Sequence, residues 1–375
     1  MSTARWSFGT WLTRLLAVTG AAGLSAGLAV AAAGPAQAAV PNKWGFAFVD
    51  KPSVASVPVL AHQAGSWPAP MHVHSTPGPG KRVFVRFPTL RSGNGVVHVT
   101  AVSGTPAWCQ ALSWAASGPD EVVGVRCYKA GGIAAFVPFT IAYTTSSKGP
   151  FPAAAAYGYV HYQPGSGIVA KFNSTGAPVT VTPVAPGRWT VRMLALASAA
   201  QQGNVQVTAV NPTVPAKCEL QKWAWGGNGQ VFSVNCYDQA AAPLKTGWTL
   251  SYTHLRAITG TKPVHYAYTF NNKPLVPGPY APVPAGVNFS SLAGVNTIRT
   301  AGAGLSLVLL PRVGALPNTV LVTPFNAGPG FCDLLSVWGT TPGAAGAVTV
   351  RDVACYSPAG TPAKRASLIT YTAAP

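Results

Sequence analysis

The sequence predicts an all-β protein in which three tandem domains of β-sandwich or jelly-roll type each carry one disulfide. Three observations lead to this prediction. The chain contains an internal repeat of about 110 residues. Its cysteines fall in pairs within the repeats. Many short runs of β-forming residues are separated by Gly, Pro, Asn or Ser, and no stretch shows sustained helical periodicity.

The first forty residues differ in character from the rest of the chain. Arg5 and Arg14 precede an apolar stretch that runs from Leu15 to Ala33. A Gly-Pro helix breaker comes next, and the small residues of Ala36-Gln37-Ala38 follow it. This order is typical of a secretory signal peptide that is cleaved after Ala38. We therefore expect residues 1–38 to be removed and the mature protein to be secreted. No membrane span is expected to remain, because no later run has roughly twenty unbroken apolar residues.

The charge of the chain is one-sided. Only 9% of the residues are charged, yet 25 Lys and Arg stand against 7 Asp and Glu, which gives a net charge of +18. Loss of the two arginines in the signal peptide would reduce this charge to +16. Such a surplus favours solubility and weak attraction to polyanions. For an exported protein the polyanions would be wall polymers, acidic polysaccharides or extracellular DNA. A solubility role alone explains the charge equally well.

The cysteines mark the repeat. Each second cysteine has a valine two residues before it and a tyrosine directly after it, as in Val125-Arg126-Cys127-Tyr128. Each first cysteine follows a strand-like run such as Val99-Thr100-Ala101-Val102 and precedes a tryptophan. Pro-containing segments near residues 148–150 and 260–263 have the composition of linkers. The expected repeats are therefore residues 39–149 (repeat 1), 150–262 (repeat 2) and 263–375 (repeat 3).

An even number of cysteines in an exported chain indicates disulfides. Within the repeats the paired cysteines are 18, 18 and 23 residues apart, and each bridge is expected to link neighbouring strands. A metal site or a redox role is disfavoured, because no CxxC spacing occurs and no histidines accompany the cysteines at ligand spacing. The predicted bridges are Cys109–Cys127, Cys218–Cys236 and Cys332–Cys355.

One strand in each repeat shows which side faces the core. Period-two alternation places one set of residues inside and the other outside. The inner sets are expected to be Val83, Val85 and Phe87, then Trp189, Val191 and Met193, then Leu305, Leu307 and Leu309. The outer sets are expected to be Arg82, Phe84 and Arg86, then Arg188, Thr190 and Arg192, then Gly304, Ser306 and Val308.

The outward arginines are the predicted binding residues. Arginine beside an aromatic side chain suits sulfate, phosphate, carboxylate or sugar groups. An exposed strand face that arginine merely keeps soluble is the competing interpretation. The predicted set consists of Arg82, Phe84, Arg86, Arg188 and Arg192.

Other residue types give weaker indications. His72 and His74 would project from one face of a strand as two ligands for zinc or copper, but repeats 2 and 3 lack the pair and the ligand set is incomplete. The residue after each first cysteine is Gln110, Glu219 or Asp333, which indicates a polar structural contact more than a general acid. We select no catalytic residue and predict no cofactor.

The repeat resembles those of secreted actinobacterial proteins of uncharacterised function. The resemblance is clearest at Gly187 to Met193, Gly203 to Ala209, Cys218 and Val234 to Tyr237, and it is partial in repeats 1 and 3. It implies an exported, disulfide-containing β-repeat and no particular activity.

These features together predict a secreted, non-catalytic binding or cell-surface-associated protein. Its three β-modules would contact an anionic cell-wall polymer or a polysaccharide through a basic surface, without specific recognition of nucleic acid. An exported hydrolase with an active site between domains and a protein-binding or inhibitor module remain alternatives. A further hypothesis is that the three copies pack around a pseudo-threefold axis. The sequence does not determine the oligomeric state or the ligand.

Overall fold

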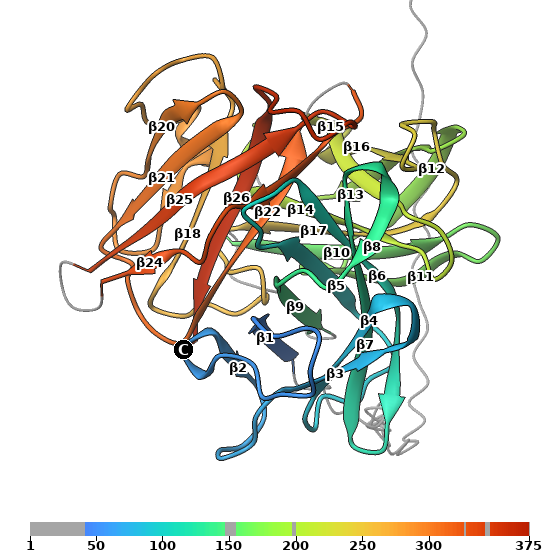
Figure 1. The fold of residues 1–375 in the computed structure, drawn as a ribbon. Coiled ribbons are helices and arrows are strands. Elements are labelled where there is room, and N and C mark those ends of the chain that lie inside the picture. The colour runs from blue at the N-terminus through green and yellow to red at the C-terminus, as the bar shows by residue number, and fades with distance from the viewer. Residues whose placement is uncertain (1–41, 147–154, 197–199, 326–327, 342–345, 375) are drawn as a thin grey trace, which may run out of the picture. The chain divides into compact units, whose positions relative to one another are not determined.

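The computed structural model describes residues 42–146, 155–196, 200–325, 328–341 and 346–374 (Figure 1). Strands make up 57% of the chain, and the described residues contain no helix of seven or more residues, so the predicted all-β class is confirmed. The predicted signal peptide and the linker expected at residues 148–150 lie outside the described residues. The short helices in the described part are η1 (Leu60–His62), η2 (Pro79–Lys81), η3 (Ala130–Gly132) and η4 (Ala285–Val287).

Repeat 1 forms one layer of four strands and one layer of five. One has the strand order β2-β1-β9-β5, and the other has the order β3-β4-β7-β6, with β8 paired to β7. The strands are β1 (Lys43–Val49), β2 (Gln63–Gly65), β3 (His74–Gly78), β4 (Arg82–Phe87), β5 (Val96–Ala101), β6 (Ala107–Ser117), β7 (Asp120–Lys129), β8 (Ile133–Ala135) and β9 (Phe139–Thr145).

Repeat 2 has the same arrangement, with four strands in each layer. Its layers have the orders β11-β10-β17-β14 and β12-β13-β16-β15. The strands are β10 (Ala156–Gln163), β11 (Gly167–Asn173), β12 (Val179–Ala185), β13 (Arg188–Leu194), β14 (Asn204–Val210), β15 (Lys217–Gly226), β16 (Gly229–Tyr237) and β17 (Gly247–His254).

Repeat 3 follows the same plan. Its layers have the orders β19-β18-β26-β22 and β20-β21-β25-β23, with β24 paired to β25. The strands are β18 (Tyr266–Asn271), β19 (Phe289–Ser290), β20 (Thr297–Gly302), β21 (Leu305–Pro311), β22 (Asn318–Phe325), β23 (Phe331–Leu334), β24 (Gly339–Thr340), β25 (Ala347–Tyr356) and β26 (Ala366–Ala373).

The core of repeat 1 lies between its two layers. Val83, Val85 and Phe87 of β4 are buried against Val97 and Ile141 of the opposite layer, while the alternate residues of β4 are exposed. The strand β13 of repeat 2 alternates in the same way. The inner and outer faces predicted for these two strands are therefore correct.

The prediction for repeat 3 is wrong by one residue. In β21 the buried residues are Ser306, Val308 and Leu310, whereas Leu309 is exposed. The reason is the position of Gly304, whose carbonyl accepts a hydrogen bond from the Cys355 N–H just as the carbonyl of Gly187 does from Cys236. Gly304 thus corresponds to Gly187, so the buried residues of β21 lie one position later in the chain than the expected ones.

The three predicted disulfides are confirmed. In each one the two cysteines are directly opposite each other on antiparallel neighbours, β6 with β7, β15 with β16, and β23 with β25. The Cα atoms are 4.0 to 4.1 Å apart, as suits a non-hydrogen-bonded pair. The bridges are Cys109–Cys127, Cys218–Cys236 and Cys332–Cys355.

Parallel contacts join the layers of different repeats in cyclic order. Ala111 of β6 pairs with Val210 of β14, which connects repeat 1 to repeat 2. Leu220 of β15 pairs with Phe325 of β22, which connects repeat 2 to repeat 3. A bridge between Leu334 and Val102 then connects repeat 3 back to repeat 1. The described residues of the three repeats accordingly group into one compact unit.

The inner strands of the three repeats meet one another. β5, β14 and β22 are in mutual contact, and they lie close together near the centre of Figure 1. A threonine on each strand accepts a hydrogen bond from a valine N–H of another repeat: Val99 to Thr208 (3.2 Å), Val207 to Thr323 (2.9 Å) and Val322 to Thr100 (3.0 Å). This cyclic pattern is the one that the hypothesis of a pseudo-threefold axis requires.

Candidate functional site

The outer face of β4 carries part of the predicted binding set. Arg82, Phe84 and Arg86 all point away from the core, and the Phe84 side chain is 37% exposed. Antiparallel pairing brings β3 to one side of β4 and β7 to the other. In this register His74 lies directly opposite Arg86.

A recess of about 440 Å³ lies over this face, and we call it the aromatic recess. Phe84 and Trp114 supply its large aromatic surfaces, and Arg86 and His74 supply polar groups. A volume of this size falls in the range of ligand pockets in proteins, about 300 to 1,000 Å³. The other lining residues are Thr76, Ser113, Ala115, Ala116, Ser117, Val122 and Gly124.

Arg86 is held in position without being buried. Its Nη1 donates a hydrogen bond to Asp120 Oδ2 at 3.1 Å, and its side chain remains 51% exposed. The second Asp120 oxygen accepts the Thr89 backbone N–H at 2.9 Å. Because a guanidinium has five N–H donors, this contact orients Arg86 and leaves capacity to bind a carboxylate, sulfate or sugar hydroxyl.

Trp114 extends the aromatic recess toward repeat 2. Its ring centroid lies 4.4 Å from that of His161 on β10. Burial lowers the pKa of His161 to about 4, so the imidazole is neutral at physiological pH. Its Nε2 then accepts a hydrogen bond from the Gln163 side-chain amide at 3.1 Å. Trp114, which lines the recess, therefore packs against an uncharged imidazole of repeat 2.

A second recess, of about 540 Å³, carries positive charge, and we call it the basic recess. Lys43, Arg91 and Lys171 line it, and the Lys43 Nζ donates a hydrogen bond to the Arg91 carbonyl at 2.5 Å. Hydroxyl and amide groups of other lining residues could add hydrogen bonds to an anionic ligand. The remaining lining residues are Ser92, Asn94, Thr145, Ser146, Tyr159, Val169 and Ala170.

Two sets of contacts connect the aromatic recess with the basic recess. His161, which contacts Trp114 of the aromatic recess, pairs across β10 and β11 with Ala170 of the basic recess. On the other side, Arg86 binds Asp120 while the Arg91 N–H donates to the carbonyl of the neighbouring Pro119 at 3.0 Å. Repeats 1 and 2 both contribute residues to this surface.

Comparison with known proteins gave no match.

That result covers protein-family models, curated proteins and solved structures alike. The function is therefore inferred from the chain's own residues and their geometry.

The other predicted binding residues lie elsewhere. Arg82 is exposed on β4 but does not line either recess. Arg188 and Arg192 are exposed on β13, which belongs to a different sheet from β4. The structure thus brings only Phe84 and Arg86 of the predicted five into one recess.

The two candidate metal ligands do not converge on one recess. His74 lines the aromatic recess, whereas His72 lines another hollow together with Trp67 and Met71. Among the described residues, no group of three or more His, Cys, Asp or Glu side chains is placed to hold a metal ion. None of the short helices in the described part has the length and apolar character needed to span a membrane.

The residues that follow the first cysteines make contacts between repeats. Gln110 Oε1 accepts the Ala216 N–H at 2.7 Å, and Asp333 Oδ2 accepts the Ala107 N–H at 3.1 Å. These two bonds are equivalent, since each N–H belongs to the residue two positions before a first cysteine.

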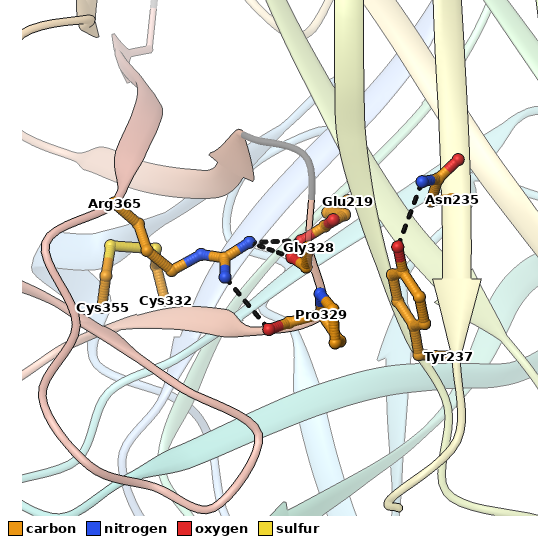
Figure 2. Close-up of polar contacts among 8 residues, drawn as sticks. All are labelled: Glu219, Asn235, Tyr237, Gly328, Pro329, Cys332, Cys355 and Arg365. Atoms are coloured by element: carbon orange, nitrogen blue, oxygen red, sulfur yellow. Dashed lines mark hydrogen bonds and ion pairs between the residues drawn. A yellow bond between two sulfur atoms is a disulfide. The ribbon is translucent and has the colours of Figure 1, made fainter. Parts of the chain in front are cut away.

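At the third position, Glu219 forms a buried ion pair instead. The Arg365 guanidinium lies 2.6 Å from Glu219 and also donates to the carbonyls of Gly328 and Pro329, beside the Cys332–Cys355 bridge (Figure 2). Burial raises the pKa of Glu219, and the Arg365 charge acts against that rise. Glu219 and Asp333 therefore hold repeats together, as expected of polar structural contacts.

Several site residues could not be found from the sequence. Lys43, Arg91 and Lys171 are far apart along the chain and share no motif. In the sequence, Trp114 stands out only as the tryptophan that follows a first cysteine. Its counterpart Trp223 is buried in the core of repeat 2, so the position in the repeat gave no sign of exposure.

Proposed function

We propose that this chain is a secreted, non-catalytic binding protein that contacts an anionic polysaccharide or cell-wall polymer through the aromatic and basic recesses. The observation that carries the proposal is that Phe84, Trp114 and Arg86 line one recess beside a second one lined by three cations. Aromatic faces suit the apolar faces of sugar rings, and cations suit their carboxylate, sulfate or phosphate substituents.

The size and charge of the surface support a polymer rather than a small molecule. Two neighbouring recesses of about 440 and 540 Å³ offer room for several linked sugar units. The net charge of +16 expected after loss of Arg5 and Arg14 raises the local concentration of polyanions and speeds their association at low salt. Arginine can add a bidentate contact with a carboxylate or sulfate group.

The proposal includes secretion and a division into three β-sandwich domains. Three disulfides are typical of proteins that fold in an oxidising compartment, and the first 38 residues have the order of a signal peptide. Two layers of four or five strands in each repeat support the sandwich description. The resemblance to secreted actinobacterial repeat proteins agrees with export.

The first test is retention of the mature chain, residues 39–375, on cell walls, acidic polysaccharides and neutral glycans at low and high salt. We expect retention on an anionic polymer that weakens as salt rises, because exposed charges are screened. Arg86→Ala and Lys171→Ala should reduce it.

Arg192→Ala is the matched control. It removes one exposed arginine from a strand, as Arg86→Ala does, but lies outside both recesses. Equal losses for Arg86→Ala and Arg192→Ala would mean attraction by overall charge and would remove the recesses from the proposal. Lack of retention on any polymer would contradict the proposed function altogether.

A further inference from the structure

Two arginines lie directly opposite each other on the outer face of repeat 1. Arg82 of β4 pairs with Arg126 of β7 in the antiparallel register. Arg82 is exposed and Arg126 is partly exposed, so solutes reach both side chains. Like charges directly opposite each other on neighbouring strands destabilise a sheet. The pair therefore has a cost in stability that a bound anion would remove.

The two guanidinium groups lie near one another at the start of β4. A Cβ atom placed on Gly80 would lie 3.1 Å from Arg126 Nη2, so this guanidinium rests against the turn that leads into Arg82. Burial raises the pKa of Tyr128, and Arg126 and Arg82 both act against this rise. Both positive charges are therefore close to the same tyrosine.

The charges of the pair are not balanced by their neighbours. Among the described residues, neither arginine belongs to an ion pair. Gly78 and Gln110 complete the row of side-by-side residues across these strands. Gly78 has no side chain, and the Gln110 amide is already hydrogen-bonded to backbone atoms of repeat 2. Both arginine charges therefore remain available to a ligand.

The equivalent rows in the other repeats lack a second arginine. The row of repeat 2 consists of Arg188, Asn235 and Glu219. There the Asn235 side chain donates a hydrogen bond to the Tyr237 hydroxyl at 3.1 Å (Figure 2). The row of repeat 3 consists of Leu305, Ala354 and Asp333. The paired arginines are therefore specific to repeat 1, and the shared fold does not require them.

The repeats also differ in charge at the point where they meet, but the cation there is enclosed. The residues before the three first cysteines line a central cavity of about 40 Å³, and they are Trp108, Lys217 and Phe331. The Lys217 Nζ has less than 1 Å² of accessible surface, so it offers no atom to a ligand. It lies 4.7 and 5.5 Å from the centroids of the two aromatic rings. Exposure thus distinguishes the paired arginines from this lysine.

We propose that Arg82 and Arg126 together bind one sulfate or phosphate group. Arginine forms bidentate hydrogen bonds with such oxyanions. A tetrahedral group presents several oxygens, so it accepts hydrogen bonds from two guanidinium groups at once, whereas a carboxylate has only two oxygens. The site lies outside the aromatic and basic recesses and does not depend on the proposed polymer binding.

The direct test is a crystal of the mature chain, residues 39–375, soaked in sodium selenate as an analogue of sulfate. We expect an anomalous selenium peak between the two guanidinium groups. In solution, calorimetric titrations with inorganic sulfate and with inorganic phosphate should each show binding in a chloride background at constant ionic strength. The oxyanion that binds more tightly identifies the group for which the site is suited.

Two variants each remove one member of the pair. Arg82→Gln changes an exposed residue, and Arg126→Asn introduces the side chain that repeat 2 has at the equivalent position. Each should weaken oxyanion binding about tenfold or more, because a hydrogen bond to a charged group contributes at least that factor. Arg188→Gln is the matched control, since it removes the unpaired arginine at the position of Arg82 in repeat 2 and should leave binding unchanged.

Three results would overturn the proposal. They are the absence of a selenium peak between the guanidinium groups, an equal loss of binding in Arg188→Gln, and competition by chloride as strong as that by sulfate. Selenate binding and polymer retention are measured separately, so failure of the proposed function and failure of this site are distinguishable.

Discussion

Thr100 accepts a hydrogen bond from the backbone N–H of Val322 at 3.0 Å, although 222 residues separate them along the chain. Two equivalent bonds complete a ring through the three repeats. Each threonine thus satisfies a buried N–H that belongs to a different repeat. The contact between repeats therefore depends on specific polar pairs in addition to apolar packing.

Thr323→Val should destabilise the protein, because it leaves the buried Val207 N–H without its acceptor. Loss of a buried partner costs about 1–3 kcal/mol, measurable as a lower free energy of unfolding in guanidinium. Thr182→Val, at an exposed position of β12, is the control and should change it by less than about 0.5 kcal/mol. Equal effects of the two variants would show that the ring contributes nothing specific.

The disulfide of repeat 2 should contribute measurably to stability. It closes a loop with a sequence separation of 18 residues, and a loop of about this length is worth roughly 3 kcal/mol in the chain-entropy model. The double variant Cys218→Ala, Cys236→Ala should lower the free energy of unfolding by about that amount. An unchanged guanidinium midpoint would contradict this expectation.

Asp333 should make stability fall as the pH rises. Burial raises its pKa from 3.8 to about 8 in the folded protein, and the Ala107 N–H only partly opposes this. Between these pH values the folded chain binds more protons than the unfolded chain, so the free energy of unfolding decreases with increasing pH.

Asp333→Asn keeps an acceptor for Ala107 but does not titrate. The variant should show a smaller decrease in unfolding free energy between pH 4 and pH 8 than the unaltered chain, measured by denaturation at several pH values. Glu219 adds a dependence of the same sign, so part of the slope should remain. Identical slopes would show that Asp333 does not titrate in this range.

The two recesses should differ in their response to salt. Phe84→Ala removes an exposed aromatic face and should weaken binding to the retained polymer about fivefold at every salt concentration, equivalent to about 1 kcal/mol. Lys171→Ala should weaken binding mainly at low salt, because its contribution is electrostatic. Calorimetric titration at two salt concentrations distinguishes these patterns. The same salt response for both variants would argue against separate aromatic and charged contacts.

The parts of the fold that could be predicted depend on short-range signals. The pairs of cysteines lie within two adjacent strands, so their spacing was sufficient to assign the bridges. In β4 and β13, arginines alternate with apolar residues, which fixed the inner face. In β21, both Leu309 and Leu310 are apolar, so alternation could not decide between two registers. Only the equivalence of Gly304 and Gly187, both at positive φ, sets the correct one.

The candidate site was predicted only in part, because much of it is made by long-range contacts. Phe84 and Arg86 share a strand face and were found. Lys43 and Lys171 come from repeats 1 and 2, and they line one recess only because these repeats pack against each other. Lys217 occupies a position that is aromatic in the other repeats, but no local pattern indicates that this position lies where the three repeats meet.

The single lysine beside the central cavity shows what covalent linkage of the three copies permits. In a trimer of identical chains, any residue at this position would occur three times. Three ammonium groups around a cavity of about 40 Å³ would repel one another strongly. Three aromatic residues at the same position would place no charge there. Because one chain encodes all three positions, each can diverge separately. The protein thereby keeps the packing of a symmetric assembly while placing one positive charge at its centre.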